Sequence, residues 1–292
     1  MTITFMETWK SEKVNPLSIT IGHYMNIEGV RIHYLQKGEG QPVILIHGLG
    51  AYSYTWRYNF DELAHDFKVY ALDLKGFGLS DKPKKTGYSI DDHVKLVQKF
   101  IEKIEEKPVH LVGSSMGGEI GLRICLDSPE LIDKLVLIGS SGYRDRIPWY
   151  YRVLGYLPYN QWVKRYIQKK YLKEELLAQV VKDAFYDPEK LKPQEIKNYI
   201  YPVFLTGFEE AYLSLFRKFD FGKRLNEYSA IQHQALILAG ENDRVIPLQH
   251  LQRLNQDLSN STLVTLKKAG HFLHEERPEV VNQLIHQFLL NN

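Results

Sequence analysis

The chain has 292 residues, of which 44% are hydrophobic and 25% are charged, and its formal net charge is +2. This length allows one large domain with an insertion, and the near-neutral charge gives no reason to expect a nucleic-acid partner. The one cysteine, Cys125, excludes an intramolecular disulfide and is typical of a protein from a reducing compartment.

The N-terminal segment, residues 1–16, has neither the positively charged start nor the continuous apolar core of a signal peptide. No later stretch approaches the roughly twenty consecutive apolar residues that a membrane-spanning helix needs. We therefore expect a cytoplasmic protein. The oligomeric state stays open, because nothing in this segment decides whether it pairs with another chain.

Residues 18–36 form two alternating segments around Glu28 and Gly29, which predicts an antiparallel hairpin. Further apolar runs predict strands at Val43, Lys68, Val109, Leu135, Ala235 and Thr262. Helical spacing predicts helices at residues 54–65, 89–106, 117–127 and 278–290. Because strands alternate with helices, we predict an α/β fold: a mostly parallel, twisted, eight-stranded sheet with helices on both faces.

The segment 142–228 interrupts this alternation and differs from the rest in composition. It holds 12 of the 19 tyrosines, and its Lys and Arg outnumber its Asp and Glu by 16 to 11. Helical spacing recurs at residues 161–173 and 174–185. We predict that it forms an inserted helical cap, or lid, and that residues 1–141 and 229–292 form the core domain. The basic and aromatic composition also leaves contact between the cap and a membrane surface open.

Ser115 lies in a Gly-x-Ser-x-Gly pattern between a predicted strand and a predicted helix. This pattern is typical of a nucleophile elbow, a sharp turn that exposes a serine. The turn needs small residues two positions either side, where Gly113 and Gly117 stand. Taken alone the pattern is a weak signal, because glycine and serine are common in turns.

Two more residues supply the partners that a serine nucleophile needs. Asp243 follows the predicted strand at Ala235, and His271 follows the strand at Thr262. Both therefore lie past the carboxyl ends of strands, where open α/β sheets bind ligands. We predict Ser115, Asp243 and His271 as a catalytic triad. Glu241 and His274 are the nearest rivals for the acid and the base.

The apolar run that starts at Val43 ends in His47, Gly48, Leu49 and Gly50. A loop at this place supplies one oxyanion donor in serine enzymes of this kind, and the residue after the nucleophile supplies the other. We predict the backbone N–H groups of Leu49 and Met116 as these donors. His47 is interpreted as a brace for the loop, and the turn-rich segment 73–81 as a shaping element beside the elbow.

Together these pieces resemble an α/β-hydrolase of the serine-nucleophile group, which includes carboxylesterases, monoacylglycerol lipases and carbon–carbon bond hydrolases. Haloalkane dehalogenases and epoxide hydrolases are similar, but they carry an aspartate where this chain has Ser115. The matching motifs are HGLG at His47, DLKGFGLSDKP at Asp73, GSSMGG at Gly113, GENDRVIP at Gly240 and AGHFLHEERP at Ala269.

The expected function is a serine hydrolase that cleaves small to medium hydrophobic carboxylic esters through an acyl-enzyme, with no metal or organic cofactor. The expected partner is a small hydrophobic ester. Residues placed by position around the triad are mostly apolar, which favours an uncharged substrate. We predict as substrate-binding residues Gly48, Gly50, Ser114, Val245 and Phe272.

Two alternatives stay open. The first is a carbon–carbon hydrolase of ring-fission dienones, which the run after Ser115 resembles. Those enzymes typically carry Asn before the serine, where this chain has Ser114, and Trp after the histidine, where it has Phe272. The second is a slow-turnover ligand sensor on the same fold, because a fold alone does not fix a function.

Overall fold

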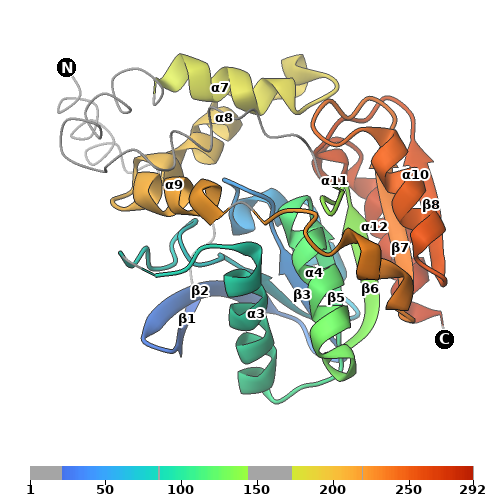
Figure 1. The fold of residues 1–292 in the computed structure, drawn as a ribbon. Coiled ribbons are helices and arrows are strands. Elements are labelled where there is room, and N and C mark those ends of the chain that lie inside the picture. The colour runs from blue at the N-terminus through green and yellow to red at the C-terminus, as the bar shows by residue number, and fades with distance from the viewer. Residues whose placement is uncertain (1–21, 85, 144–172, 219, 292) are drawn as a thin grey trace.

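One eight-stranded sheet organises the described part of the chain (Figure 1). The structure is a computed structural model that describes residues 22–84, 86–143, 173–218 and 220–291. The strands are β1 (His23–Ile27), β2 (Val30–Lys37), β3 (Pro42–Ile46), β4 (Lys68–Leu72), β5 (Val109–Ser114), β6 (Ile132–Ile138), β7 (Gln234–Gly240) and β8 (Ser261–Leu266).

The spatial order of the strands is β1-β2-β4-β3-β5-β6-β7-β8. Only the pairs that involve β2 are antiparallel, and every pair from β4 to β8 is parallel. This confirms the predicted mostly parallel sheet of eight strands. The parallel strands carry the loops discussed below at one common edge, because parallel strands all end on the same side.

Helices cover both faces of the sheet, as predicted. One face packs against α3 (Ile90–Ile104), α4 (Met116–Asp127) and α10 (Leu248–Asp257), and the other against α2 (Phe60–Leu63) and α12 (Pro278–Leu290). Strand β3 shows why a continuous apolar run suits this position. Its Ile44 and Ile46 pack on the first face, while Val43 and Leu45 pack on the second.

Three of the four predicted helices, α3, α4 and α12, lie within two residues of their expected bounds, and the fourth differs. Helix α12 spans the expected residues, and α3 begins after Ser89, whose side chain accepts from the Asp92 backbone in a capping box. The expected helix over 54–65 is instead a 3₁₀ turn, η1 (Ser53–Trp56), followed by the short α2. Asn59 lies between the two, and its side-chain amide donates to His274 O and Asn282 Oδ1.

The chain between β6 and β7, called the insert below, adds helices beyond the edge of the sheet (Figure 1). The predicted helix at 174–185 is confirmed as α7, whereas that at 161–173 lies outside the described residues except for Lys173. Helices α8 and α9 were not predicted. The described elements are α7 (Glu174–Asp183), η3 (Pro188–Lys190), α8 (Pro193–Ile200), η4 (Tyr201–Phe204), α9 (Phe208–Lys218) and η5 (Leu225–Ala230).

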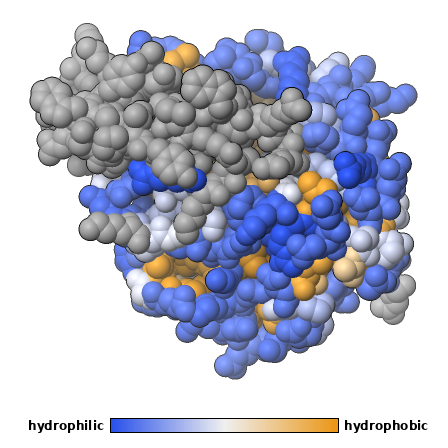
Figure 2. Space-filling model, viewed as in Figure 1, coloured by the Kyte–Doolittle hydropathy of each residue, from blue (hydrophilic) through white to orange (hydrophobic). Residues whose placement is uncertain are grey.

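The surface seen in Figure 2 is mostly hydrophilic, with apolar residues in separate patches. Exposed large apolar side chains are common singly on globular proteins. None of the helices in the described ranges is both long enough and apolar enough to cross a membrane.

A buried ion network fixes α4 against the end of the insert. Arg123 is fully buried and binds Glu119 at 2.7 Å and Asp220 at 2.9 Å. Glu119 also accepts hydrogen bonds from the Gly222 backbone and from the Ser141 hydroxyl. The helix that follows Ser115 is therefore tied to the insert through charged groups.

We expect Arg123→Met to lower the free energy of unfolding by roughly 3–5 kcal/mol, because it leaves buried carboxylates without their cation. Urea unfolding followed by circular dichroism measures this change. Lys37→Met is the matched control, since Lys37 pairs with Asp61 on the exposed surface and its loss should cost less than about 1 kcal/mol. Equal stability of the two variants would contradict the prediction.

Candidate active site

Ser115 lies on a sharp turn between β5 and α4. Its backbone has φ 52° and ψ −116°, a conformation that costs a non-glycine residue energy and needs support from its surroundings. The strand end β6 gives that support. The Ser115 N–H donates to Ile138 O at 2.9 Å, and the Ser115 carbonyl accepts from the Ser141 N–H at 3.1 Å.

The two glycines of the Gly-x-Ser-x-Gly pattern are required by space. A Cβ on Gly117 would lie 2.2 Å from Ile46 O, and a Cβ on Gly113 would lie 2.4 Å from the Gly117 carbonyl carbon. Both neighbours are backbone atoms that a rotamer change cannot move. The turn predicted from the sequence thus depends on the absence of side chains at these two positions.

The structure brings Asp243 and His271 together. Asp243 Oδ2 lies 2.8 Å from His271 Nδ1, and the two side chains are 1% and 6% exposed. A carboxylate only accepts hydrogen bonds, so Nδ1 carries a proton and donates it to Asp243, and in the neutral ring Nε2 then presents a lone pair. The other carboxylate oxygen, Oδ1, accepts from the Val245 N–H at 2.7 Å and the Ile246 N–H at 2.9 Å.

The end of β6 backs this pair. Gly139 has φ 51°, and a Cβ there would lie 3.2 Å from His271 Nδ1 and 3.3 Å from Asp243 Oδ2. The same strand end holds the backbone of Ser115. The turn that carries Ser115 and the Asp243–His271 pair therefore share one support.

The rivals named from the sequence lie in other surroundings. His274 is fully buried, contacts Thr55 Oγ1 through Nε2 at 3.0 Å, and packs over Trp56. Burial lowers the pKa of His274 to about 3, so its ring is neutral. Glu241 is exposed.

The loop after β3 passes directly beside Ser115. A Cβ on Gly48 would lie 3.0 Å from Ser115 Cβ and 3.6 Å from its Oγ. Leu49 follows, and Met116 opens α4, where the first N–H groups have no partner within the helix. In the described ranges, neither of these two N–H groups donates to a protein acceptor, and no hydrogen bond joins Ser115 Oγ to the His271 ring.

His47 braces this loop, as interpreted from the sequence. Its Nε2 accepts from the Leu74 N–H at 3.0 Å, so Nδ1 carries the proton and donates to Gly48 O at 2.7 Å. Burial lowers the pKa of His47, which keeps the ring neutral. The histidine thus links the loop beside Ser115 to the segment after β4.

Asp73 shows how the 73–81 segment shapes the site. Its Oδ1 accepts from the Ser53 N–H at 2.7 Å, and its Oδ2 accepts from the Leu79 N–H at 2.8 Å and contacts His33 at 2.9 Å. Burial alone would raise the pKa of Asp73, but these hydrogen bonds and the His33 ring lower it. The carboxylate holds two loops in place from a fully buried position.

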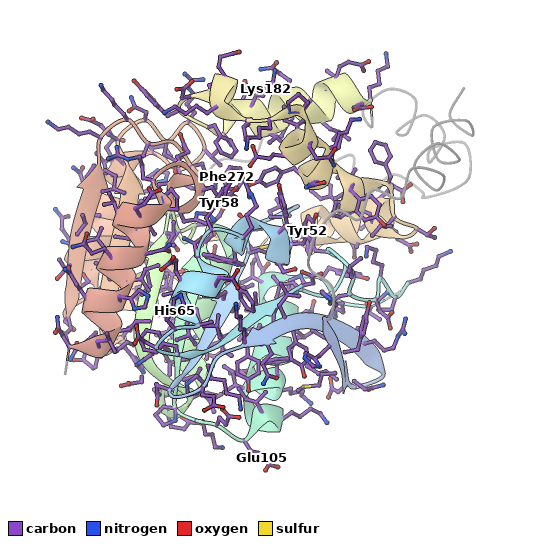
Figure 3. The ribbon with its side chains drawn as sticks, turned by 180° about the vertical axis from the view of Figure 1, so that it is seen from behind. Tyr52, Tyr58, His65, Glu105, Lys182 and Phe272 are labelled. Atoms are coloured by element: carbon purple, nitrogen blue, oxygen red, sulfur yellow. The ribbon has the colours of Figure 1, made fainter. Side chains whose placement is uncertain are left out.

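An aromatic cluster joins the insert to the loop of His271. Phe272 packs against Phe185 and Tyr199 of the insert, with ring centroids 5.2 Å and 5.6 Å apart. Tyr52 donates its hydroxyl to Asn198 O at 2.9 Å. Figure 3 shows Phe272 and Tyr52 between the insert helices and the sheet. Phe272 is thus the predicted substrate-binding residue with the clearest contact to the insert.

The other predicted substrate-binding residues differ in their surroundings. Gly48 lies beside Ser115, and a Cβ on Gly50 would meet open space. Ser114 is buried, and its hydroxyl has no partner among the described residues. Val245 is 46% exposed, and its backbone N–H donates a hydrogen bond to Asp243.

The sequence did not point to Arg57, which joins three parts of the molecule. Its guanidinium binds Glu275 next to the His271 loop and Glu195 of α8 at 3.1 Å. It also lies 4.3 Å from the ring centroid of Tyr54. No local pattern marks such a residue, because its partners are far away in the chain.

Among the described residues, no group of three or more His, Cys, Asp or Glu side chains is placed to hold a metal ion. The polar groups on the sheet edge that carries Ser115 are a histidine oriented by an aspartate and the backbone N–H groups of the loop beside Ser115. Such groups transfer a proton and bind an oxyanion.

Comparison with known proteins places the chain among hydrolases. A sequence model of the alpha/beta hydrolase fold matches residues 41–278. An uncharacterized hydrolase of Bacillus subtilis, YugF, is 31% identical over 90% of this chain and 96% of its own. The 2-hydroxy-6-oxo-2,4-heptadienoate hydrolase of Pseudomonas putida is 28% identical over 92% and 96%. A meta-cleavage product hydrolase structure from Pseudomonas fluorescens IP01 is 26% identical over 92% and 97%, with TM-score 0.75.

Proposed function

The chain belongs to the alpha/beta hydrolase fold family, and from this premise we propose that it is a serine hydrolase whose nucleophile is Ser115. One observation carries the proposal: His271 is held at 2.8 Å by Asp243, with its second ring nitrogen free, on the sheet edge that also carries Ser115. Ser115 is half-buried on this edge, and a serine together with a base that an acid orients is the arrangement that nucleophilic acyl chemistry needs.

In the proposed reaction, His271 Nε2 takes the proton of the Ser115 hydroxyl as its oxygen attacks a substrate carbonyl. Asp243 keeps the ring in the required tautomer and stabilises the imidazolium. The N–H groups of Leu49 and Met116 bind the oxyanion. His271 then protonates the leaving group, and a water molecule releases the acyl group from Ser115 by the same steps.

The relatives favour a carbon leaving group over an alcohol. The relative from Pseudomonas putida is named for a 2-hydroxy-6-oxo-dienoate, and the Pseudomonas fluorescens structure for a meta-cleavage product. In such a substrate the serine attacks the ketone, and the carbon that leaves must receive a proton. The first candidate substrate class is therefore a ring-fission dienone, the alternative to an ester that the sequence leaves open.

Esters, the class first expected from the sequence, are the second candidate. The His271 loop packs through Phe272 against an aromatic cluster in which burial raises the pKa of Tyr52 and Tyr199, so both stay uncharged. The Arg57 guanidinium lies against this cluster, but it is paired with Glu275 and Glu195. This surrounding suits an uncharged acyl chain. Ser114 and Phe272, where carbon–carbon hydrolases typically carry Asn and Trp, also favour it.

The test compares the two classes on one enzyme. We expect higher kcat/KM for 2-hydroxy-6-oxohepta-2,4-dienoate, followed by loss of dienone absorbance, than for p-nitrophenyl esters from acetyl to octanoyl. The reverse order with a clear optimum of acyl length would establish the ester class. If the wild-type protein turns over both substrate classes no faster than Ser115→Ala does, the proposal is overturned in favour of a ligand sensor.

A further inference from the structure

The backbone of His271 is bonded to the insert. Its N–H donates to the carbonyl of Ala184 at 2.8 Å. Ala184 is the C-cap of α7, so its carbonyl is one of those that a helix end leaves without an intrahelical donor. The residue proposed as the base is therefore attached by its own main chain to a segment outside the sheet.

Glu276 makes a second link at the same place. Its Oε1 accepts from the Gly270 N–H at 2.8 Å, and its Oε2 accepts from the Tyr186 N–H at 2.8 Å. One carboxylate thus joins the residue before His271 to the insert. Both oxygens are used. Burial raises the pKa of Glu276, and the backbone hydrogen bonds from Gly270 and Tyr186 oppose that rise because they favour the ionised carboxylate.

Gly270 shows how closely the two chains approach. A Cβ there would lie 2.6 Å from Tyr186 N and 2.7 Å from Ala184 O. Its φ lies outside the left-handed region, so the glycine is needed for space and not for its backbone conformation. The main chains of the insert and of the His271 loop are in direct contact.

The neighbouring carboxylate serves a different contact. Glu275 accepts from Thr55 Oγ1 at 2.5 Å and binds Arg57. Thr55 lies in η1, and Arg57 directly follows it. Of these two adjacent acids, Glu276 is therefore the one that bridges the insert and the residue next to His271.

We propose that Glu276 is a positioning residue for His271. Together with Ala184, Tyr186, Gly270 and the His271 backbone it forms what we call the histidine clasp. The clasp holds the backbone of the His271 loop against residues 184–186 of the insert and thereby orients the His271 ring. This inference rests on the proposed role of His271 in catalysis.

The first test is Glu276→Gln. Glutamine keeps one acceptor oxygen but turns an NH₂ group toward the other backbone N–H, so one side of the clasp opens. We expect kcat to fall by roughly 10- to 100-fold, the effect of a small misplacement of a catalytic group, with a smaller change in KM. Glu279→Gln is the matched control, since Glu279 is an exposed acid on the next helix.

The second test is Gly270→Ala, which keeps the carboxylate but places a methyl group between the two chains. We expect the same loss of kcat, and slower labelling of Ser115 by a fluorophosphonate probe across the pH range. Thermal unfolding separates this from simple loss of fold, because the assays are run well below the melting temperature of each variant.

Amide hydrogen exchange measures the hydrogen bonds of the histidine clasp independently of catalysis. Faster exchange at His271 and Tyr186 in Glu276→Gln, together with lower kcat, supports the proposal. Unchanged kcat in both variants, or unchanged exchange at these two amides, overturns it. If wild-type Ser115 neither reacts with the probe nor turns over substrate, the proposed function fails, and the exchange data alone decide whether the clasp exists.

Discussion

Replacing Ser115 with alanine is expected to lower kcat by about five to six orders of magnitude, as loss of the nucleophile does in serine hydrolases. The variant should fold normally, because the turn is held by backbone hydrogen bonds that do not involve the hydroxyl: the Ser115 N–H donates to Ile138 O, and the Ser141 N–H donates to Ser115 O. Steady-state kinetics on the better of the two substrate classes, with titration of active sites by a fluorophosphonate probe, measures the loss.

Ser128→Ala is the matched control for this change. Ser128 lies at the other end of α4, and its hydroxyl accepts from Gln98 at 3.0 Å, so its replacement removes one partly buried hydrogen bond far from the proposed nucleophile. Wild-type kinetics are expected. Turnover by Ser115→Ala at a measurable fraction of the wild-type rate would rule out a covalent serine mechanism.

Asp243→Asn is expected to lower kcat by about 10⁴-fold through the tautomer of His271. Oδ1 of Asp243 accepts from the Val245 and Ile246 N–H groups, so in the variant the amide oxygen takes that place. The amide NH₂ then faces His271 Nδ1, which must accept. The ring proton moves to Nε2, the nitrogen that has to take the proton of Ser115.

Glu241→Gln separates this effect from a general loss of negative charge. Glu241 is exposed and lies two residues earlier in the same loop, and its replacement should leave kcat unchanged. The measurement is kcat/KM over the pH range for both variants. A loss in Glu241→Gln that equals the loss in Asp243→Asn would show that the acid has been misassigned.

The sheet was predictable because its strands carry strong local signals. The run Val43 to Ile46 is apolar at every position, and both faces of that strand are buried. Two of the missed helices, α8 and α10, have few buried residues, although α7, which was predicted from its spacing, has none. In α10 the buried positions are Leu251 and Leu254, a single pair that sets no visible period, and in α8 they are three consecutive residues at its end.

The residues of the candidate site can also be divided into those that a local sequence signal indicates and those that it does not. Ser115, Asp243 and His271 each follow a strand and have glycines nearby, so local sequence indicates them. The histidine clasp has no such signal, because Glu276 and Tyr186 are 90 positions apart and the partner is a backbone N–H. A main-chain donor is present at every non-proline residue, so no side-chain pattern encodes which one is used.

The backbone contacts of the turn at Ser115 set where its side chain points, and they do not depend on which reactive group that side chain carries. Every contact that forces the turn involves backbone atoms or the missing Cβ atoms of Gly113 and Gly117. Any unbranched side chain at position 115 would therefore leave the turn at the same place and in the same direction. In such a scaffold, a single substitution at position 115 can change the attacking atom without changing the fold.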